Sequence, residues 1–178
     1  DWDTDFDHAG QRVAIVGSGA SAAQVIPAIA PDVEHLHVFQ RTPHWVMPRN
    51  DREFTPLQRR LLRVEPIRKL VRSAIYWTLE TRIIGFKYSR RALKAVAQRA
   101  AVKHLATQVP DADLRAKLTP DYLIGCKRVI LSDTLYPSLG ASNVTLHDKN
   151  DGIVEITETG LVTTSGEHVD IDLRVWST

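Results

Sequence analysis

The stretch Arg12-Val-Ala-Ile-Val-Gly-Ser-Gly-Ala-Ser-Ala22 decides the fold, because a short apolar run passes directly into a glycine-rich turn. An apolar run that ends in Gly17 is typical of a buried parallel strand. Residues 18–30 predict a helix rich in Ala and Ile, which Pro27 should bend or shorten. Residues 35–39 alternate and predict a second strand. The unit 12–39 is therefore strand–helix–strand, which implies a right-handed crossover within a parallel sheet.

A basic helical insertion follows at about residues 55–118. Thr55 and Pro56 are typical of a helix N-cap and a first-turn proline. Between residues 59 and 103 the chain carries thirteen Lys or Arg against two Glu, a net charge of +11. Apolar residues recur there at helical spacing, and we expect Gly85 to interrupt the helices.

The last third of the chain predicts strands. Candidates are residues 128–132 and 143–147, a hairpin of 153–158 and 161–164 joined at Thr159-Gly160, and a final strand at 170–176. The expected fold is therefore an α/β, Rossmann-like parallel sheet with a helical insertion and a C-terminal β-hairpin.

Size and composition suit one globular domain. The chain has 178 residues, of which 43% are hydrophobic and 25% charged, and its net charge of +2 does not argue for nucleic acid. No apolar run is long enough to span a bilayer. The single cysteine, Cys126, cannot form an internal disulfide, which fits a reducing compartment, so we expect a cytoplasmic location.

The basic insertion leaves a minor alternative. A charged helical face is usually solvated, but basic residues interleaved with aromatic ones could also contact nucleic acid or an anionic membrane surface. We expect no nucleic-acid partner, and we keep membrane-surface association as the less favoured alternative.

Residues Gly17, Ser18, Gly19, Ala20, Ser21 and Ala22 match the dinucleotide fingerprint G-x-G-x-x-A. In such a turn the first glycine reverses the chain, the second lets the backbone approach a pyrophosphate, and the small third residue lets helix and strand pack closely. Free amides and the helix dipole then bind the phosphates. The strand before and the helix after this turn favour a dinucleotide site. The alternative is that the glycines only reverse the chain and the serines cap the helix.

The residues after the second strand indicate which dinucleotide binds. Proteins that bind NAD usually place an Asp or Glu there for the ribose 2′-hydroxyl, but this chain has Phe39-Gln-Arg-Thr42. Arg41 can pair with a 2′-phosphate in bidentate fashion, and the Thr42 hydroxyl can donate to it. We therefore favour NADPH over NADH. The alternative is that Arg41 is an ordinary solvated charge.

Three segments resemble Baeyer–Villiger monooxygenases, which are relatives of the flavin-containing monooxygenases. They are residues 11–24, residues 38–45 (Val-Phe-Gln-Arg-Thr-Pro-His-Trp), and residues 121–128 (Asp-Tyr-Leu-Ile-Gly-Cys-Lys-Arg) with Ser132-Asp133 and Tyr136-Pro137. Trp2 lies where the family's upstream fingerprint ends, and Trp176-Ser-Thr178 resembles the family's Ala-Thr-Gly strand end. Arg174 departs from that strand's apolar pattern. The resemblance implies that residues 1–178 are the NADPH-binding domain of a larger protein that binds two dinucleotides.

The resemblance also implies an activity and roles for individual residues. NADPH reduces FAD, the reduced flavin forms a peroxyflavin with oxygen, and the peroxyflavin converts a ketone to an ester or lactone. Arg41, Thr42 and Lys127 would bind the 2′-phosphate. Arg128 would be the catalytic residue that stabilises the negative oxygenated flavin, since a guanidinium stays charged at any working pH.

The chain carries only one glycine fingerprint, so we expect the fragment alone to bind no FAD tightly and to be inactive. No Cys or His cluster has metal-ligand spacing, so no metal site is expected. The expected partners are a small ketone and the flavin-binding domain of the same polypeptide. Two alternatives remain: an N- or S-oxidising flavin monooxygenase, and a dinucleotide-binding module without catalysis.

Overall fold

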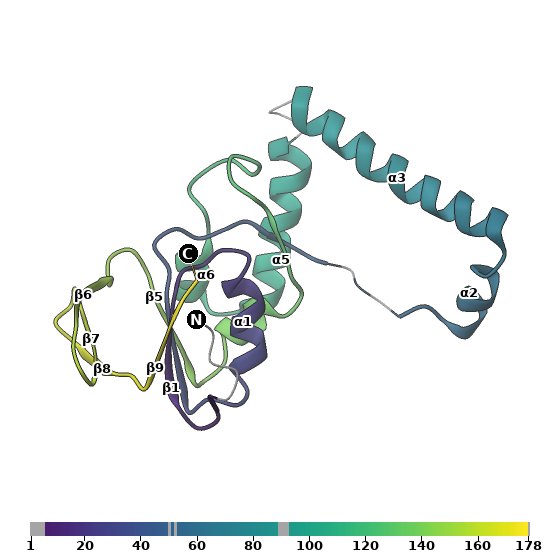
Figure 1. Ribbon diagram of the computed structural model, residues 1–178. Helices are drawn as coiled ribbons and strands as arrows, with labels where there is room; N and C mark the ends of the chain where they lie inside the picture. The colour runs from purple at the N-terminus through teal and green to yellow at the C-terminus, as the bar shows by residue number, and fades with distance from the viewer. Residues whose placement is uncertain (1–5, 50, 52, 89–92, 178) are drawn as a thin grey trace.

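A four-stranded parallel sheet forms the centre of the computed structural model, which describes residues 6–49, 51, 53–88 and 93–177, with only the backbone course for 82–88 and 93–95 (Figure 1). Every neighbouring pair in this sheet is parallel. Its order is β5 (Val144–His147), β2 (His35–Phe39), β1 (Arg12–Val16), β9 (Leu173–Trp176). The predicted Rossmann-like class is confirmed.

Helix α1 (Ala22–Ile29) connects β1 to β2 and begins later than the predicted residue 18. Residues 18–21 form a turn instead, because Gly17 adopts a left-handed φ of 128° that points the chain away from the strand direction. Pro27 lies inside α1 without ending it, and the helix closes with a hydrogen bond of 3.0 Å from Ala30 N to Ile26 O.

Both faces of the sheet are covered, by different layers. On one face α1 and α7 (Leu135–Leu139) pack over Val13, Ile15, Leu36 and Val38. On the other, Ala14 and Phe39 pack against an antiparallel sheet of β6 (Ile153–Ile156), β7 (Gly160–Thr163) and β8 (His168–Asp170). Figure 1 shows this small sheet on the side away from α1. Each fully buried aliphatic side chain in these layers contributes roughly 1.5–3 kcal/mol.

The C-terminal strands differ in detail from the prediction. The hairpin exists, but β8 adds a third strand to it, and the predicted strand 170–176 is split because Asp170 ends β8 and β9 starts at Leu173. Arg12 stabilises the turn between β8 and β9, because its guanidinium contacts Asp170 at 2.9 Å and Asp172 at 2.7 Å. Gly160 is required in β7, since a Cβ there would collide with the backbone of Val169.

The predicted strand 128–132 was also wrong in extent. Only Ile130–Leu131 (β4) is extended, and it pairs in parallel with Val46–Met47 (β3), a strand that the sequence did not predict. Arg128 therefore lies in the loop before β4. Arg174 in β9 is accommodated because its Nη2 donates to Thr157 O at 3.3 Å.

The helical insertion is confirmed, with a different internal division. Thr55 caps its first helix, as the sequence predicted, and the structure adds a reciprocal capping box with Gln58. The expectation that Gly85 interrupts the helices was wrong, since α3 continues through it. The elements are α2 (Pro56–Leu61), α3 (Glu65–Tyr88), the π-helix η1 (Leu93–Gln98), α5 (Arg99–Gln108) and α6 (Ala112–Leu118).

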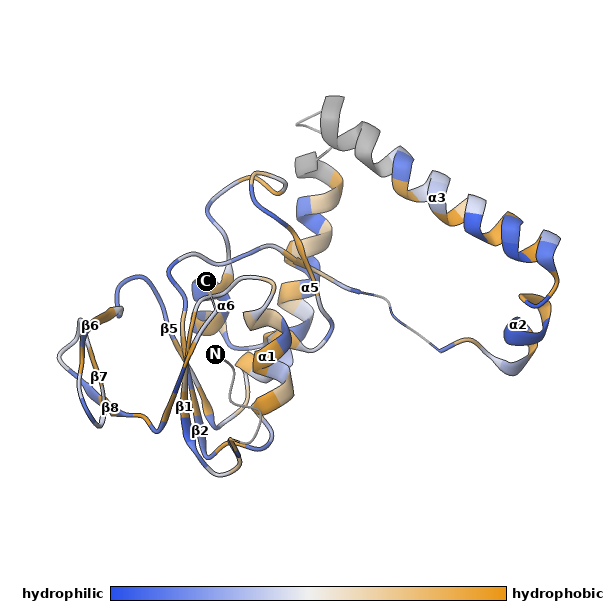
Figure 2. Ribbon diagram, viewed as in Figure 1, coloured by the Kyte–Doolittle hydropathy of each residue, from blue (hydrophilic) through white to orange (hydrophobic). Residues whose placement is uncertain are grey.

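Helices α2 and α3 extend away from the sheet as an arm (Figure 1), and apolar residues follow one side of α3 (Figure 2). No helix in the described residues is long and apolar enough to cross a membrane. Trp2 and Thr178, which carry part of the family resemblance, lie outside the described residues.

A chain of titratable groups lies on the sheet face opposite α1. His37 Nδ1 is 3.0 Å from His147 Nε2, and His147 Nδ1 is 2.7 Å from Asp151 Oδ2. The hydrogen bond from His147 lowers the pKa of Asp151 to about 2, so the carboxylate is ionised and His147 donates to it through Nδ1. Burial, with smaller contributions from His35 and His147, lowers the pKa of His37 to about 4.

We predict that the His37–His147–Asp151 contacts make the free energy of unfolding depend on pH. The unfolded state binds a proton at His37 near pH 6.5 and the folded state only near pH 4, so stability is full above pH 6.5 and falls as the pH drops between these values. The slope of the unfolding free energy should approach ~1.4 kcal/mol per pH unit. Urea denaturation between about pH 6.5 and 5 measures it. His37→Gln should remove this slope, and an unchanged slope in that variant would contradict the assignment.

Candidate functional site

The candidate site lies at the carboxyl ends of β1 and β2. The parallel register pairs Val16 with Phe39, so the glycine turn after β1 and Arg41 after β2 start from the same edge of the sheet. The amide of Gly17 donates to Phe39 O at 3.0 Å and fixes the turn to the end of β2. This edge is where ligands bind in open α/β sheets.

The glycine turn presents free backbone donors. Within the described part of the chain, the amides of residues 18–22 have no hydrogen-bond acceptor. A Cβ on Gly19 would meet no atom within 4 Å, so the space beside this residue is open. Ala22 is fully buried, which allows α1 to pack closely against β1. An open cradle of unpaired amides at a helix start fits the diphosphate of a dinucleotide.

The two serines of the turn do not act as helix caps. Ser21 precedes α1 but makes no side-chain capping hydrogen bond. Ser18 Oγ donates instead to Thr42 O at 2.9 Å and so ties the glycine turn to the loop after β2. Ala20 and Ser21 are exposed at the rim of the turn. The alternative in which the serines only cap the helix therefore has no support in the contacts.

Arg41 is exposed and joins no ion pair within the described residues. It lines a hollow of about 520 Å³ together with Phe39, Lys149 and Trp176. Thr42 is half-buried beside Ser18. The guanidinium is therefore available to an anionic ligand at the end of β2.

Lys127 and Arg128 return to this region after the helical insertion, and both are exposed. Lys127 Nζ lies 4.9 Å from the ring centroid of Tyr122, and Tyr122 Oη donates to Pro43 O at 3.0 Å. Tyr122 therefore contacts both Lys127 and the loop that carries Arg41 and Thr42.

Arg128 lines a different groove, of about 460 Å³, which reaches Ala20 of the glycine turn and Gln24 of α1. Arg49 also lines this groove and is paired with Asp51 at 3.2 Å. A cation beside the start of α1 can stabilise negative charge on a ligand that extends from the glycine turn.

Sequence reasoning missed two residues that join these parts. Tyr122 lies inside the segment 121–128, but its hydrogen bond to Pro43 spans 79 positions. No local sequence pattern predicts such a contact. His44 lies next to Lys127 and the backbone of Arg128, and burial lowers its pKa. Its Nδ1 is buried without a hydrogen-bond partner in the described residues.

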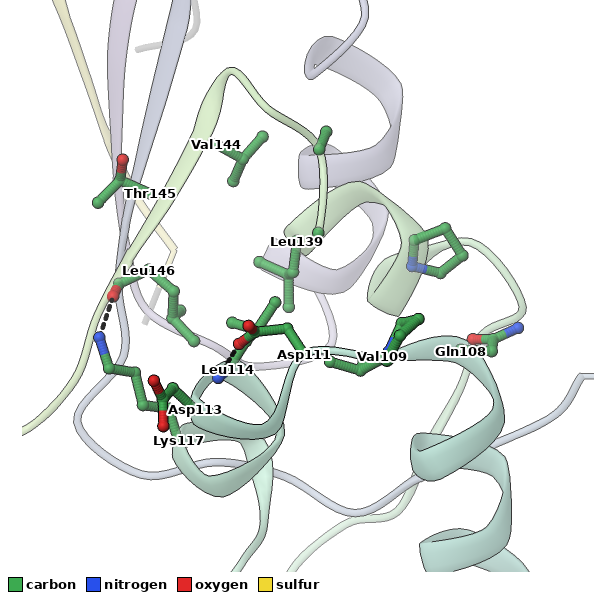
Figure 3. Close-up of a pocket in the computed structure, with 14 residues that line it drawn as sticks. Gln108, Val109, Asp111, Asp113, Leu114, Lys117, Leu139, Val144, Thr145 and Leu146 are labelled. Carbon is green, nitrogen blue, oxygen red and sulfur yellow. Dashed lines mark hydrogen bonds between the residues drawn. The ribbon is translucent and has the colours of Figure 1, made fainter.

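A third hollow, of about 460 Å³, lies between α6 and the edge strand β5 and contains none of the predicted site residues (Figure 3). Leu114, Leu139 and Leu146 line it, and Lys117 Nζ donates to Leu146 O at 3.5 Å. Helix α6 therefore covers the free edge of the sheet here. No group of three or more potential metal ligands occurs among the described residues, and Cys126 is exposed.

No family model matches the chain. Three relatives each align with 99% of the length of the chain. The Baeyer-Villiger monooxygenase of Pseudomonas aeruginosa is 42% identical over 178 residues, and that of Streptomyces coelicolor is 43% identical over 178 residues. The FAD-binding monooxygenase ktnD of Aspergillus niger is 36% identical over 183 residues. The chain covers 33%, 34% and 29% of these relatives, so it spans about a third of their length.

Solved structures give the same result. An oxidized steroid monooxygenase bound to NADP matches 99% of this chain and 40% of its own with a TM-score of 0.83 and 26% identity. An open structure of cyclohexanone monooxygenase matches 99% of this chain and 41% of its own with a TM-score of 0.80 and 25% identity. By these similarities nearly the whole chain is related to one segment of the Baeyer–Villiger monooxygenases, which makes up about a third of the length of the two bacterial relatives. This confirms the resemblance seen in the motifs of the chain.

Proposed function

We propose that residues 1–178 are the NADPH-binding domain of a larger FAD-dependent monooxygenase that inserts oxygen into ketones. The observation that carries this proposal is the open turn at residues 18–22, with its unpaired amides, beside the exposed Arg41. The names of the relatives supply the reaction, and the steroid monooxygenase bound to NADP supports the nucleotide. These names favour ketone oxygenation over N- or S-oxidation.

The residues of this chain would bind the nucleotide in two places. The amides of residues 18–22 and the positive end of α1 hold the diphosphate. Arg41, Thr42 and Lys127 hold the 2′-phosphate, where two cations and a hydroxyl replace the carboxylate that an NAD site uses. Lys127 lies over the ring of Tyr122, whose hydroxyl donates to Pro43 O of this loop.

Arg128 is the proposed catalytic residue. FAD, held mainly by the rest of the polypeptide, supplies the redox chemistry that activates oxygen. Arg128 lines the groove next to Ala20 and offers a permanent positive charge where negative charge develops. In this proposal the partners are a small ketone and the flavin-binding domain, the enzyme is cytoplasmic, and the 178-residue chain alone is inactive.

Two glycine substitutions separate the fold from binding. Gly19→Val should leave the unfolding temperature unchanged, because the added atoms enter open space, yet it should weaken NADPH binding roughly tenfold or more by blocking the amides. Gly17→Val should instead destabilise the domain by about 1–3 kcal/mol, since its φ of 128° strains any L side chain. Thermal unfolding and calorimetric titration measure the two effects. Equal NADPH affinity for Gly19→Val and wild type would exclude the cradle.

We predict that Arg41 sets the nucleotide preference. In the intact enzyme, Arg41→Ala should weaken NADPH binding roughly tenfold to a hundredfold, the range of one or more charge-assisted hydrogen bonds, and leave NADH binding unchanged. Calorimetry with both nucleotides measures this. If the preference for NADPH persists in the variant, the assignment of the 2′-phosphate site fails.

Arg128→Ala should lower the oxygenation rate by about 10²–10³, the size of a lost oxyanion-type contact, with a smaller effect on NADPH affinity. Arg49→Ala is the matched control, because Arg49 lines the same groove but is already paired with Asp51. Product formation from a ketone measures both variants. Similar losses in the two would show that Arg128 has no special role.

A further inference from the structure

We propose that Ser18 and Tyr122 are positioning residues that set the preference for a 2′-phosphate by holding the loop that carries Arg41 and Thr42. We call this pair the hydroxyl clamp. The inference rests on the proposed function, because it assumes that this loop binds the 2′-phosphate of NADPH.

The clamp acts on two consecutive carbonyls. Ser18 Oγ donates to Thr42 O at 2.9 Å, and Tyr122 Oη donates to Pro43 O at 3.0 Å. The two donors come from different parts of the chain, the glycine turn and the segment before Lys127. The loop is therefore held from both sides by groups that themselves belong to the candidate site.

The clamp also restricts the backbone of Arg41. The last hydrogen bond between β2 and β5 is made by Gln40 N, which donates to His147 O at 2.8 Å. The next bond along the chain is the one from Ser18 to Thr42 O. Arg41 lies between these two anchors, so its side chain starts from a fixed position although its guanidinium is exposed.

Tyr122 has a second role, which concerns Lys127. Its ring lies under Lys127 Nζ at 4.9 Å, and its carbonyl accepts a hydrogen bond of 2.8 Å from Trp45 Nε1. Trp45 is buried, which makes this support rigid. Burial raises the pKa of Tyr122, so its hydroxyl keeps the proton that it donates. One residue thus connects Lys127 with the loop of Arg41.

Neither hydroxyl is available to donate to a phosphate. Each hydroxyl carries one proton, and in both residues that proton is directed at a backbone carbonyl. A phosphate oxygen needs donors, so Ser18 and Tyr122 act through Arg41, Thr42 and Lys127. Fixing these flexible side chains before binding reduces the entropy lost when they meet the phosphate.

The test compares 2′,5′-ADP with 5′-AMP, which differ only by the 2′-phosphate, as calorimetric ligands of the intact enzyme. Ser18→Ala and Tyr122→Phe should each lower affinity for 2′,5′-ADP about fivefold, the size of one net hydrogen bond, and leave 5′-AMP affinity unchanged. Tyr122→Phe keeps the ring under Lys127. Tyr122→Leu removes the ring as well, so it should lower affinity for 2′,5′-ADP more than Tyr122→Phe does. Ser18→Thr retains a hydroxyl, so it should keep the wild-type ratio of the affinities for 2′,5′-ADP and 5′-AMP.

Ser138→Ala is the matched control, because Ser138 Oγ also donates to a backbone carbonyl, Thr134 O, at 2.9 Å, but neither residue lines the hollow of Arg41. It should not change the affinity ratio. Wild-type ratios in Ser18→Ala and Tyr122→Phe, or equal losses for both ligands, would overturn the clamp alone. If wild-type enzyme does not prefer 2′,5′-ADP over 5′-AMP, the proposed function itself fails and the clamp fails with it.

Discussion

The parallel pairing of β1 with β2 is the constraint on which the rest of the site depends. It aligns Val16 with Phe39, and the hydrogen bond from Gly17 N to Phe39 O then turns the chain at the edge of the sheet. Because Gly17 is in the left-handed region, α1 starts only at Ala22, and the amides of residues 18–21 have no acceptors among the described residues. No protein group accepts from these backbone N–H donors among the described residues. A bound anion would satisfy them.

The insertion matters because of where it returns. The chain leaves the sheet after β2 and comes back through β4, whose two residues pair with β3. Ile130 N donates to Trp45 O at 2.9 Å, and Ser132 N donates to Met47 O at 3.0 Å. This short pairing brings Lys127 and Arg128 close to His44 in the loop after β2, and Tyr122 donates a hydrogen bond to Pro43 of the same loop. Two segments far apart in sequence thereby contribute cations to one region.

Sequence could predict the parts of the fold that local pattern determines. The apolar run before Gly17 and the alternation in 35–39 specify β1 and β2, and Thr55 specifies the start of α2. It could not predict β3 or β4, because two-residue strands have no periodicity and exist only through pairing with each other. The prediction that Gly85 interrupts the helices failed because a single glycine destabilises a helix by only about 1 kcal/mol. The 23 other residues of α3 outweigh this cost. For the site, sequence named the turn and the cations, but the tertiary bonds of Ser18 and Tyr122 have no local signal.

In the proposed function, the amides after Gly17 and the side chain of Arg41 bind one nucleotide together. Nuclear magnetic resonance of the isotope-labelled protein, titrated with NADPH, tests this most directly, because it follows each backbone amide separately. We expect the largest chemical-shift changes at residues 18–22 and at Arg41 and Thr42. Changes confined to the hollow between α6 and β5, with the amides of 18–22 unaffected, would contradict it.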